Sequence, residues 1–197
     1  METIDVVDNY NRLKYTKLKK LVEENNLTET QFCNIFIHPF LVGKEFYDGY
    51  FAPVEDILTD HTIRFNASTL RNAVSSPENE AYSKLKKESM ARAMYLLAPT
   101  ENGEISIGRK RDNNIVMLDF ALSKQHAKII VKTDGYWILD LNSTNGTTVK
   151  NKKAEANKEM RIEIGDTICF GQRFSFVLTK PCDVYKKIVN TTKTQQE

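Results

Sequence analysis

The sequence has no run of about 18 apolar residues, which is the length that a membrane-spanning helix requires. Its first residues, Met1–Asp8, lack the basic and apolar regions of a secretory signal peptide. An excess of one charge is also missing, because 28 lysines and arginines face 26 aspartates and glutamates, for a net charge of +2. These absences argue against a membrane partner and against nucleic-acid binding through bulk charge, and they predict a cytoplasmic protein.

Cysteine and histidine are scarce, with three residues of each type. The cysteines are odd in number and too widely spaced for a metal knuckle or a redox pair, which predicts reduced thiols and no disulfide. The histidines share no metal-ligand spacing, and no nucleophile motif or nucleotide-binding glycine loop accompanies them. We therefore expect a protein that is not an enzyme and holds no metal or cofactor. The residues concerned are Cys33, Cys169, Cys182, His38, His61 and His126.

A chain of 197 residues is long for one domain and short for two, which favours one domain with an extension. Residues 1–93 contain helical patterns, at Tyr10–Glu24 before the stop signal Asn25-Asn26, and at Glu78–Ala93. Thr28 and Gln31 have capping-box spacing, so a short helix followed by irregular chain is expected there. The aromatic residues between positions 40 and 65 predict a packed layer.

From about Met94 the sequence changes to short β-prone runs separated by turn dipeptides such as Asp134-Gly135 and Gly165-Asp166. Many short strands at this spacing predict a mainly β protein, a sandwich of two antiparallel sheets with a mixed or helical N-terminal extension. The expected strands cover residues 94–97, 105–107, 115–117, 127–131, 136–140, 148–149, 161–164, 167–170 and 174–178. The polar tail, residues 181–197, is expected to be flexible.

Three short motifs are spaced through this β-rich region: Gly108-Arg109, Ser123-Lys124-Gln125-His126 and Asn142–Thr147. A protein-bound phosphate needs fixed donors, and the guanidinium of Arg109, directly after an expected strand, offers a planar fork. The small hydroxyl of Ser123 can donate to a phosphate oxygen without blocking access. In the third motif, Gly146 permits a left-handed backbone and Asn145 can bind main-chain groups.

The order and spacing of these motifs resemble the forkhead-associated (FHA) domain family over residues 94–180. The resemblance implies a phosphopeptide-binding site, and it assigns structural support of the binding loops to Gly108, His126 and Gly146. It also implies a preference for phosphothreonine over phosphoserine. The phosphopeptide-binding residues that it implies are Arg109, Ser123, Lys124, Thr144 and Asn145.

The family resemblance therefore implies a phosphothreonine-dependent protein–protein interaction module, an adaptor in Ser/Thr kinase signalling. Its expected partner is a phosphothreonine-containing protein, with a Ser/Thr kinase upstream. The alternative is an FHA-fold scaffold or oligomerisation protein that does not read phosphate. A third hypothesis, which no motif supports, is an enzyme with a site around His38, Asp48, Asp56, Asp60 or His61. Residues 1–93 resemble no family and are taken as a separate region.

Other features near the motifs depart from the family pattern or extend it. Ala121 replaces a basic contact that some members have, and the lysine- and glutamate-rich stretch Asn151–Met160 replaces an expected short turn. Gly171-Gln172-Arg173 is the expected contributor to recognition of residues after the phosphothreonine. Basic residues gather around the motifs and predict attraction of an acidic partner: Lys110, Arg111, Lys124, Lys128, Lys150, Lys152 and Lys153.

Overall fold

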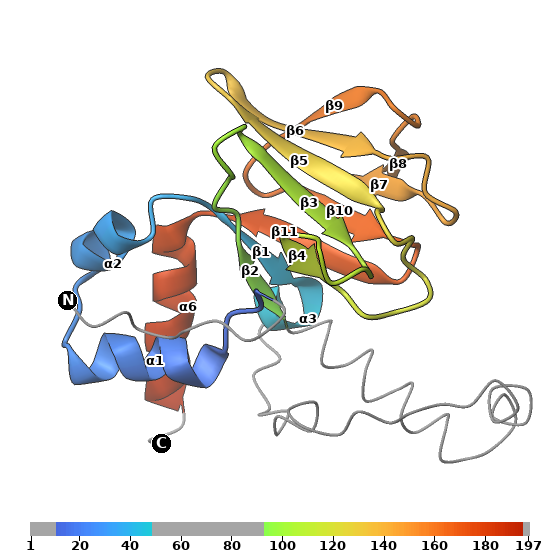
Figure 1. The fold of residues 1–197 in the computed structure, drawn as a ribbon. Coiled ribbons are helices and arrows are strands. Elements are labelled where there is room, and N and C mark those ends of the chain that lie inside the picture. The colour runs from blue at the N-terminus through green and yellow to red at the C-terminus, as the bar shows by residue number, and fades with distance from the viewer. Residues whose placement is uncertain (1–10, 49–92, 195–197) are drawn as a thin grey trace, which may run out of the picture.

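The computed structural model describes residues 11–48 and 93–194, which form a β-sandwich with helices packed at one end (Figure 1). One sheet has the spatial order β2 (Met94–Leu96), β1 (Phe40–Gly43), β11 (Phe174–Thr179), β10 (Thr167–Phe170), β7 (Thr147–Val149) and β8 (Lys152–Lys153). The other has the order β4 (Ile115–Val116), β3 (Glu104–Gly108), β5 (Ala127–Lys132), β6 (Gly135–Asp140) and β9 (Glu159–Ile162). The predicted sandwich is confirmed, and only β3 and β4 among these pairs run parallel.

The core lies between the two sheets because each sheet alternates buried and more exposed side chains, as expected for packed antiparallel strands. Ile105 and Ile107 of β3 and Ile129 of β5 point inward from one sheet. Phe170 and Phe176 meet them from the other sheet, with ring centroids 6.1 Å apart. Aromatic and branched aliphatic side chains thus fill the interior of the sandwich.

Strand β1 comes from the N-terminal region and lies between β2 and β11, antiparallel to both. Phe40, Leu41 and Val42 are all fully buried. Leu41 belongs to the core between the sheets, whereas Phe40 and Val42 face a second core beneath the helices. The expectation of irregular chain at this point is therefore wrong: the apolar run is a strand buried on both faces.

Four helices are described, namely α1 (Tyr15–Glu24), α2 (Glu29–Ile35), α3 (Lys44–Tyr47) and α6 (Pro181–Thr194), and Figure 1 shows α6 beside α1 and α2. Leu18, Phe32 and Ile188, one from each of these three helices, are fully buried in the second core. The predicted capping box of α2 is confirmed, since Thr28 Oγ1 accepts from the Gln31 amide and Gln31 Oε1 accepts from the Thr28 amide. Helix α1 ends at the predicted asparagines.

Residues 181–194 form helix α6, where the polar composition suggested a flexible tail, and residues 195–197 lie outside the described ranges. Val184 and Ile188, four positions apart, form a buried stripe in an otherwise polar segment. The Tyr185 hydroxyl also donates to the Leu27 carbonyl, at 2.7 Å. The tertiary packing of this narrow stripe therefore stabilises the segment as a helix, which the overall polar composition of the segment does not predict.

The expectation of three reduced thiols is also wrong, because a disulfide joins Cys33 of α2 to Cys182 of α6. Their Cα atoms lie 5.8 Å apart, within the usual range for a disulfide, although 149 positions separate them in the sequence. Sequence spacing could not reveal a pair that only the packing of α6 on α2 brings together. Cys169 is a free thiol.

Two further predictions, the helix at residues 78–93 and most of the aromatic layer, fall largely on residues outside the described ranges. Within residues 11–48 and 93–194, no helix combines the length and apolar character needed to cross a lipid bilayer.

Candidate functional site

The three sequence motifs meet at one end of the sandwich because of how strands β3, β5 and β6 are paired. Ile107, near the end of β3, is opposite Ala127 at the start of β5, and Ala127 is opposite Asp140 at the end of β6. The chain leaving β3, the chain entering β5 and the chain leaving β6 therefore share one edge. Arg109, Ser123 and the β6–β7 loop that carries Thr144 lie on these three segments.

Hydrogen bonds join the three segments directly. The Arg109 amide donates to the Ser123 carbonyl, at 3.0 Å, and the Lys110 amide to the Lys124 carbonyl, at 3.1 Å. The Thr144 amide donates to Ser123 Oγ, at 3.1 Å, and the two hydroxyl oxygens of Ser123 and Thr144 lie 3.5 Å apart. The site therefore presents two neighbouring hydroxyls on loops whose backbone is bonded to that of Arg109, and the exposed residue Lys124 follows Ser123 directly.

Gly108 allows the β3–β4 loop to approach the β4–β5 loop closely. A Cβ at this position would lie 2.4 Å from the Lys124 carbonyl oxygen, closer than any side chain can be accommodated against rigid backbone. Buried Asn113 fills the remaining space, and its Nδ2 donates to the carbonyls of Lys110, at 2.6 Å, and Lys124, at 2.8 Å. Sequence reasoning missed Asn113, which stands in a charged loop without a recognisable pattern.

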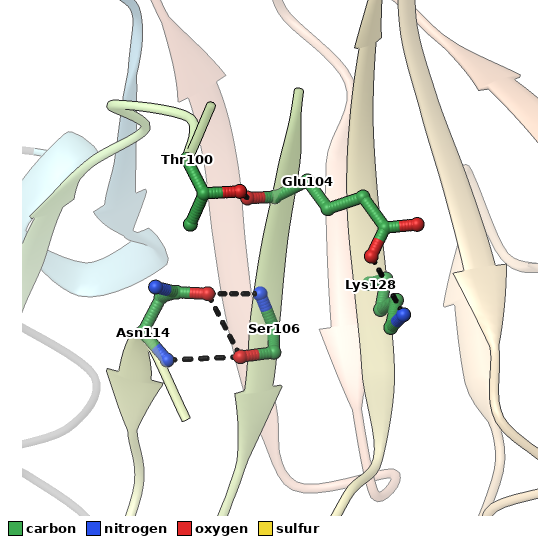
Figure 2. A network of polar contacts seen from close by, with 5 residues as sticks. All are labelled: Thr100, Glu104, Ser106, Asn114 and Lys128. Atoms are coloured by element: carbon green, nitrogen blue, oxygen red, sulfur yellow. Dashed lines mark hydrogen bonds and ion pairs between the residues drawn. The ribbon is translucent and has the colours of Figure 1, made fainter. Parts of the chain in front are cut away.

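A second asparagine closes the base of the β3–β4 loop, as Figure 2 shows. Asn114 Oδ1 accepts from both the amide and the hydroxyl of Ser106 on β3, each at 2.8 Å, and the Asn114 amide donates to Ser106 Oγ, at 3.0 Å. Farther along β3, Lys128 of β5 pairs with Glu104, at 2.7 Å. The end of the loop that leads into β4 is thus bonded to β3 at Ser106.

His126 lies fully buried beneath the site and connects two of its loops. The Ser123 amide donates to Nδ1, at 3.1 Å, so the proton of the neutral ring resides on Nε2, which donates to the Gly146 carbonyl, at 3.2 Å. Burial lowers the pKa of the ring, opposed in part by the Gly146 carbonyl and by nearby Asp140. The neutral tautomer is the one that satisfies both loops.

Replacing His126 with alanine is expected to lower the free energy of unfolding by about 2–4 kcal/mol, because a buried amide and a buried carbonyl lose their partner. The stability of the natural protein should also fall as the pH drops below about 6.5, where the unfolded chain binds a proton that the folded ring resists. Denaturant unfolding at pH 7.5 and pH 5.5 measures both effects. The partly exposed His38, replaced by alanine, is the control; an unchanged pH dependence in the His126 variant would contradict this account.

Asp140, at the end of β6, organises the β6–β7 loop and was not identified from the sequence. Its carboxylate accepts from the Ser143 amide, at 2.9 Å, from the Ser143 hydroxyl, at 2.7 Å, and from the Thr147 hydroxyl, at 2.6 Å. Although burial acts to raise the pKa of Asp140, these hydrogen bonds and nearby His126 together lower it. The loop is therefore anchored on a carboxylate that stays ionised.

Asn145 and the β10–β11 turn complete the edge. Asn145 Nδ2 donates to the Ala121 carbonyl, at 2.9 Å, and Gln172 Nε2 donates to the Asn145 carbonyl, at 3.2 Å. A Cβ on Gly171, whose φ is +63°, would lie 2.4 Å from the Ala121 carbonyl oxygen, so glycine permits this turn to pack on the β4–β5 loop. Gly171-Gln172-Arg173 thus borders the site, and its part in recognising residues after the phosphothreonine stays a prediction.

The basic residues around the motifs contribute less free charge than their number suggests. Ion pairs join Lys110 to Asp112, Lys128 to Glu104 and Lys150 to Asp166. Exposed surface pairs such as Lys110–Asp112 are weak, but all three pairs reduce the local positive potential. Lys124, Lys152 and Lys153 form no ion pair with any residue in the described ranges.

The prediction that the stretch Asn151–Met160 replaces a short turn is wrong. Val149 of β7 pairs with Lys152 of β8, so Lys150 and Asn151 alone form the turn. Their φ angles are +49° and +64°, as in the two-residue turns typical of β-hairpins. The turn thus precedes most of the lysine- and glutamate-rich stretch, which continues into β8 and the loop before β9.

The sandwich is similar to known proteins in its sequence. Residues 105–171 match the family model of the FHA domain. The FHA domain-containing protein FhaB of Mycobacterium tuberculosis is 31% identical over 68 residues, which are 34% of this chain and 43% of FhaB. The chain therefore spans less than half the length of this curated relative.

Solved FHA domain structures give similar matches. One, from a study of phosphothreonine-dependent FHA domain interactions, is 31% identical, with a TM-score of 0.38 over 44% of this chain and 82% of that chain. The N-terminal FHA domain of Saccharomyces cerevisiae Rad53p, in complex with a phosphothreonine peptide, is 27% identical, with a TM-score of 0.36 over 39% and 67%. Residues 105–171, which carry the three motifs, are therefore identified by the family match as an FHA domain.

The FHA domain is a binding module and not an enzyme family. Within residues 11–48 and 93–194, no group of three or more histidine, cysteine, aspartate or glutamate side chains is arranged to hold a metal ion.

Proposed function

We propose that this chain is a phosphothreonine-dependent protein–protein interaction module. The observation that carries the proposal is the juxtaposition of Arg109, Ser123 and Thr144 on one edge, with Ser123 and Thr144 in direct hydrogen-bonded contact. A phosphate bound there would receive charge-assisted hydrogen bonds from the guanidinium and further bonds from the hydroxyls and from Lys124. The family match over residues 105–171 supports the same role.

In this proposal, Asn145 reads the backbone of the bound peptide. Its amide already donates one bond to the Ala121 carbonyl, which fixes the orientation of the side chain. A carboxamide has two N–H bonds and an oxygen acceptor, so capacity for a ligand is left. Gly108, His126 and Gly146 support the loops from below.

The proposed biological role is that of an adaptor in Ser/Thr kinase signalling, with a phosphothreonine-containing protein as partner. A cytoplasmic location would suit that role. The Cys33–Cys182 disulfide argues against a cytoplasmic location, since disulfides are rare in reducing compartments.

Binding of a randomised phosphothreonine peptide library to the full chain tests the proposed function. We expect capture at roughly micromolar affinity, from two or three charge-assisted hydrogen bonds less the cost of ordering the peptide. Phosphoserine and unphosphorylated libraries are the controls, and phosphoserine is expected to bind about 10-fold or more weakly, because it lacks the methyl group of phosphothreonine. Equal capture of all three libraries would overturn the proposal and favour a scaffold that does not read phosphate.

A further inference from the structure

Phe120 is the most exposed large apolar side chain of the described residues, with 81% of its surface accessible. It lies in the β4–β5 loop, three positions before Ser123, and the neighbouring side chain of Leu118 is 36% exposed. Exposed phenyl rings are costly to solvate, and apolar groups gathered on a protein surface commonly mark an interaction site. None of the three sequence motifs assigns a role to this ring.

The ring is held on a rigid loop and not on a mobile tip. Buried Asp119 accepts from the Ala121 amide through Oδ1, at 2.8 Å, and from the Leu122 amide through its carbonyl, at 3.1 Å. On the other side, the Ala121 carbonyl receives Asn145 Nδ2 and is in close contact with Gly171. The backbone on both sides of Phe120 is therefore fixed, so binding a ligand against the ring would cost little ordering.

The ring also lies beside the phosphate-binding guanidinium. Arg109 Cζ is 5.8 Å from the centroid of Phe120, a distance at which the cation and the ring attract one another. Consecutive residues of a peptide are about 3.8 Å apart at their Cα atoms. A peptide whose phosphate rests on Arg109 thus brings a residue within one or two positions of the phosphothreonine into reach of the ring.

We propose that Phe120 is a specificity-determining residue, which contacts an apolar side chain one or two positions from the phosphothreonine of the partner. The inference rests on the proposed function and deepens it. The ring offers no hydrogen-bond donor, and it lies next to the Arg109 guanidinium. An apolar partner residue would bury surface on the ring, whereas a basic one would be repelled by Arg109.

The test compares phosphothreonine peptides that carry leucine or serine at each of the two positions on either side, measured by fluorescence anisotropy. At one of these positions the natural protein should prefer leucine by about 5- to 10-fold. Phe120→Ser should abolish this preference while affinity for the serine peptide changes less than about two-fold. Phe120→Leu, which keeps an apolar side chain, should retain part of the preference. Ile37→Ser, at a residue 73% exposed between α2 and β1, is the matched control.

The outcomes separate the inference from the proposed function. Phosphate-dependent binding without a leucine preference, or with one that survives in Phe120→Ser, would overturn the inference alone. A uniform loss of affinity for every phosphopeptide would also overturn it, since the ring would then only orient Arg109. Loss of self-association in Phe120→Ser, seen by sedimentation with peptide preference unchanged, would assign the ring to a second copy instead. Equal binding of unphosphorylated peptides would overturn both.

Discussion

Arg109→Ala is expected to weaken binding of a phosphothreonine peptide by about 100-fold or more, which takes a micromolar interaction to a Kd of about 100 μM or higher. The guanidinium is proposed to supply two charge-assisted hydrogen bonds to the phosphate, worth about 1.5–3 kcal/mol each. Arg109→Lys keeps the charge but loses the planar fork, so about a 10-fold loss is expected for it. Isothermal titration calorimetry with a peptide chosen from the library measures both effects.

The fold should survive this change, because the Arg109 amide keeps its bond to the Ser123 carbonyl in the alanine variant. Arg161→Ala is the control: this exposed arginine of β9 is bonded to the Asp134 carbonyl, near the hairpin turn at the opposite end of the sheet. Full affinity of Arg109→Ala, with Arg161→Ala equally unaffected, would remove Arg109 from the proposed phosphate site. An equal loss in both would indicate long-range electrostatics.

Phe40→Ala is expected to lower the free energy of unfolding by about 3–5 kcal/mol, the usual cost of truncating a fully buried phenylalanine. Phe40 contacts the helical core and packs 5.5 Å from Phe36 between ring centroids. Such a loss is a large part of the stability of an ordinary domain. Guanidinium unfolding monitored by circular dichroism measures it.

Ile37→Ala, three residues earlier and largely exposed, should change stability by less than about 0.5 kcal/mol. If the Phe40 and Ile37 variants unfold alike, β1 is dispensable for the sandwich. The same reasoning predicts that a fragment of residues 94–180 does not fold cooperatively, since removal of β1 leaves β2 without its described partner and exposes an edge of β11.

The sequence predicted the sandwich well because its strands alternate in polarity and end at strong turn signals, such as those at Gly135 and Gly165. It also pointed to the residues of the three motifs, because each of these positions needs a particular side chain for a recognisable chemical reason. Asn113 and Asp140 were missed because their importance comes from main-chain groups that only the folded loops place around them.

The N-terminal region was harder to predict for a different reason. Strand β1 is only four residues long and pairs with β2 and β11, and helix α6, at the other end of the described chain, shares one buried core with it. The buried stripe of α6 consists of few residues in a polar segment, and Cys33 and Cys182 meet only through this packing. Local sequence patterns do not show which segments, far apart along the chain, contact one another in the fold.

The position of β1 also bears on the order in which the protein assembles. In the sheet of β3, β5, β6 and β9, neighbours in space are close in sequence, so these strands can pair as soon as they are synthesised. Phe40, in contrast, is paired with Thr179 of β11 and waits for nearly the whole described chain. Closing so long a loop before any pairing is gained slows folding. During synthesis, β1 can pair with β2, but its other edge stays unpaired until β11 has left the ribosome, and this is the interval in which a chaperone would be most useful to this chain.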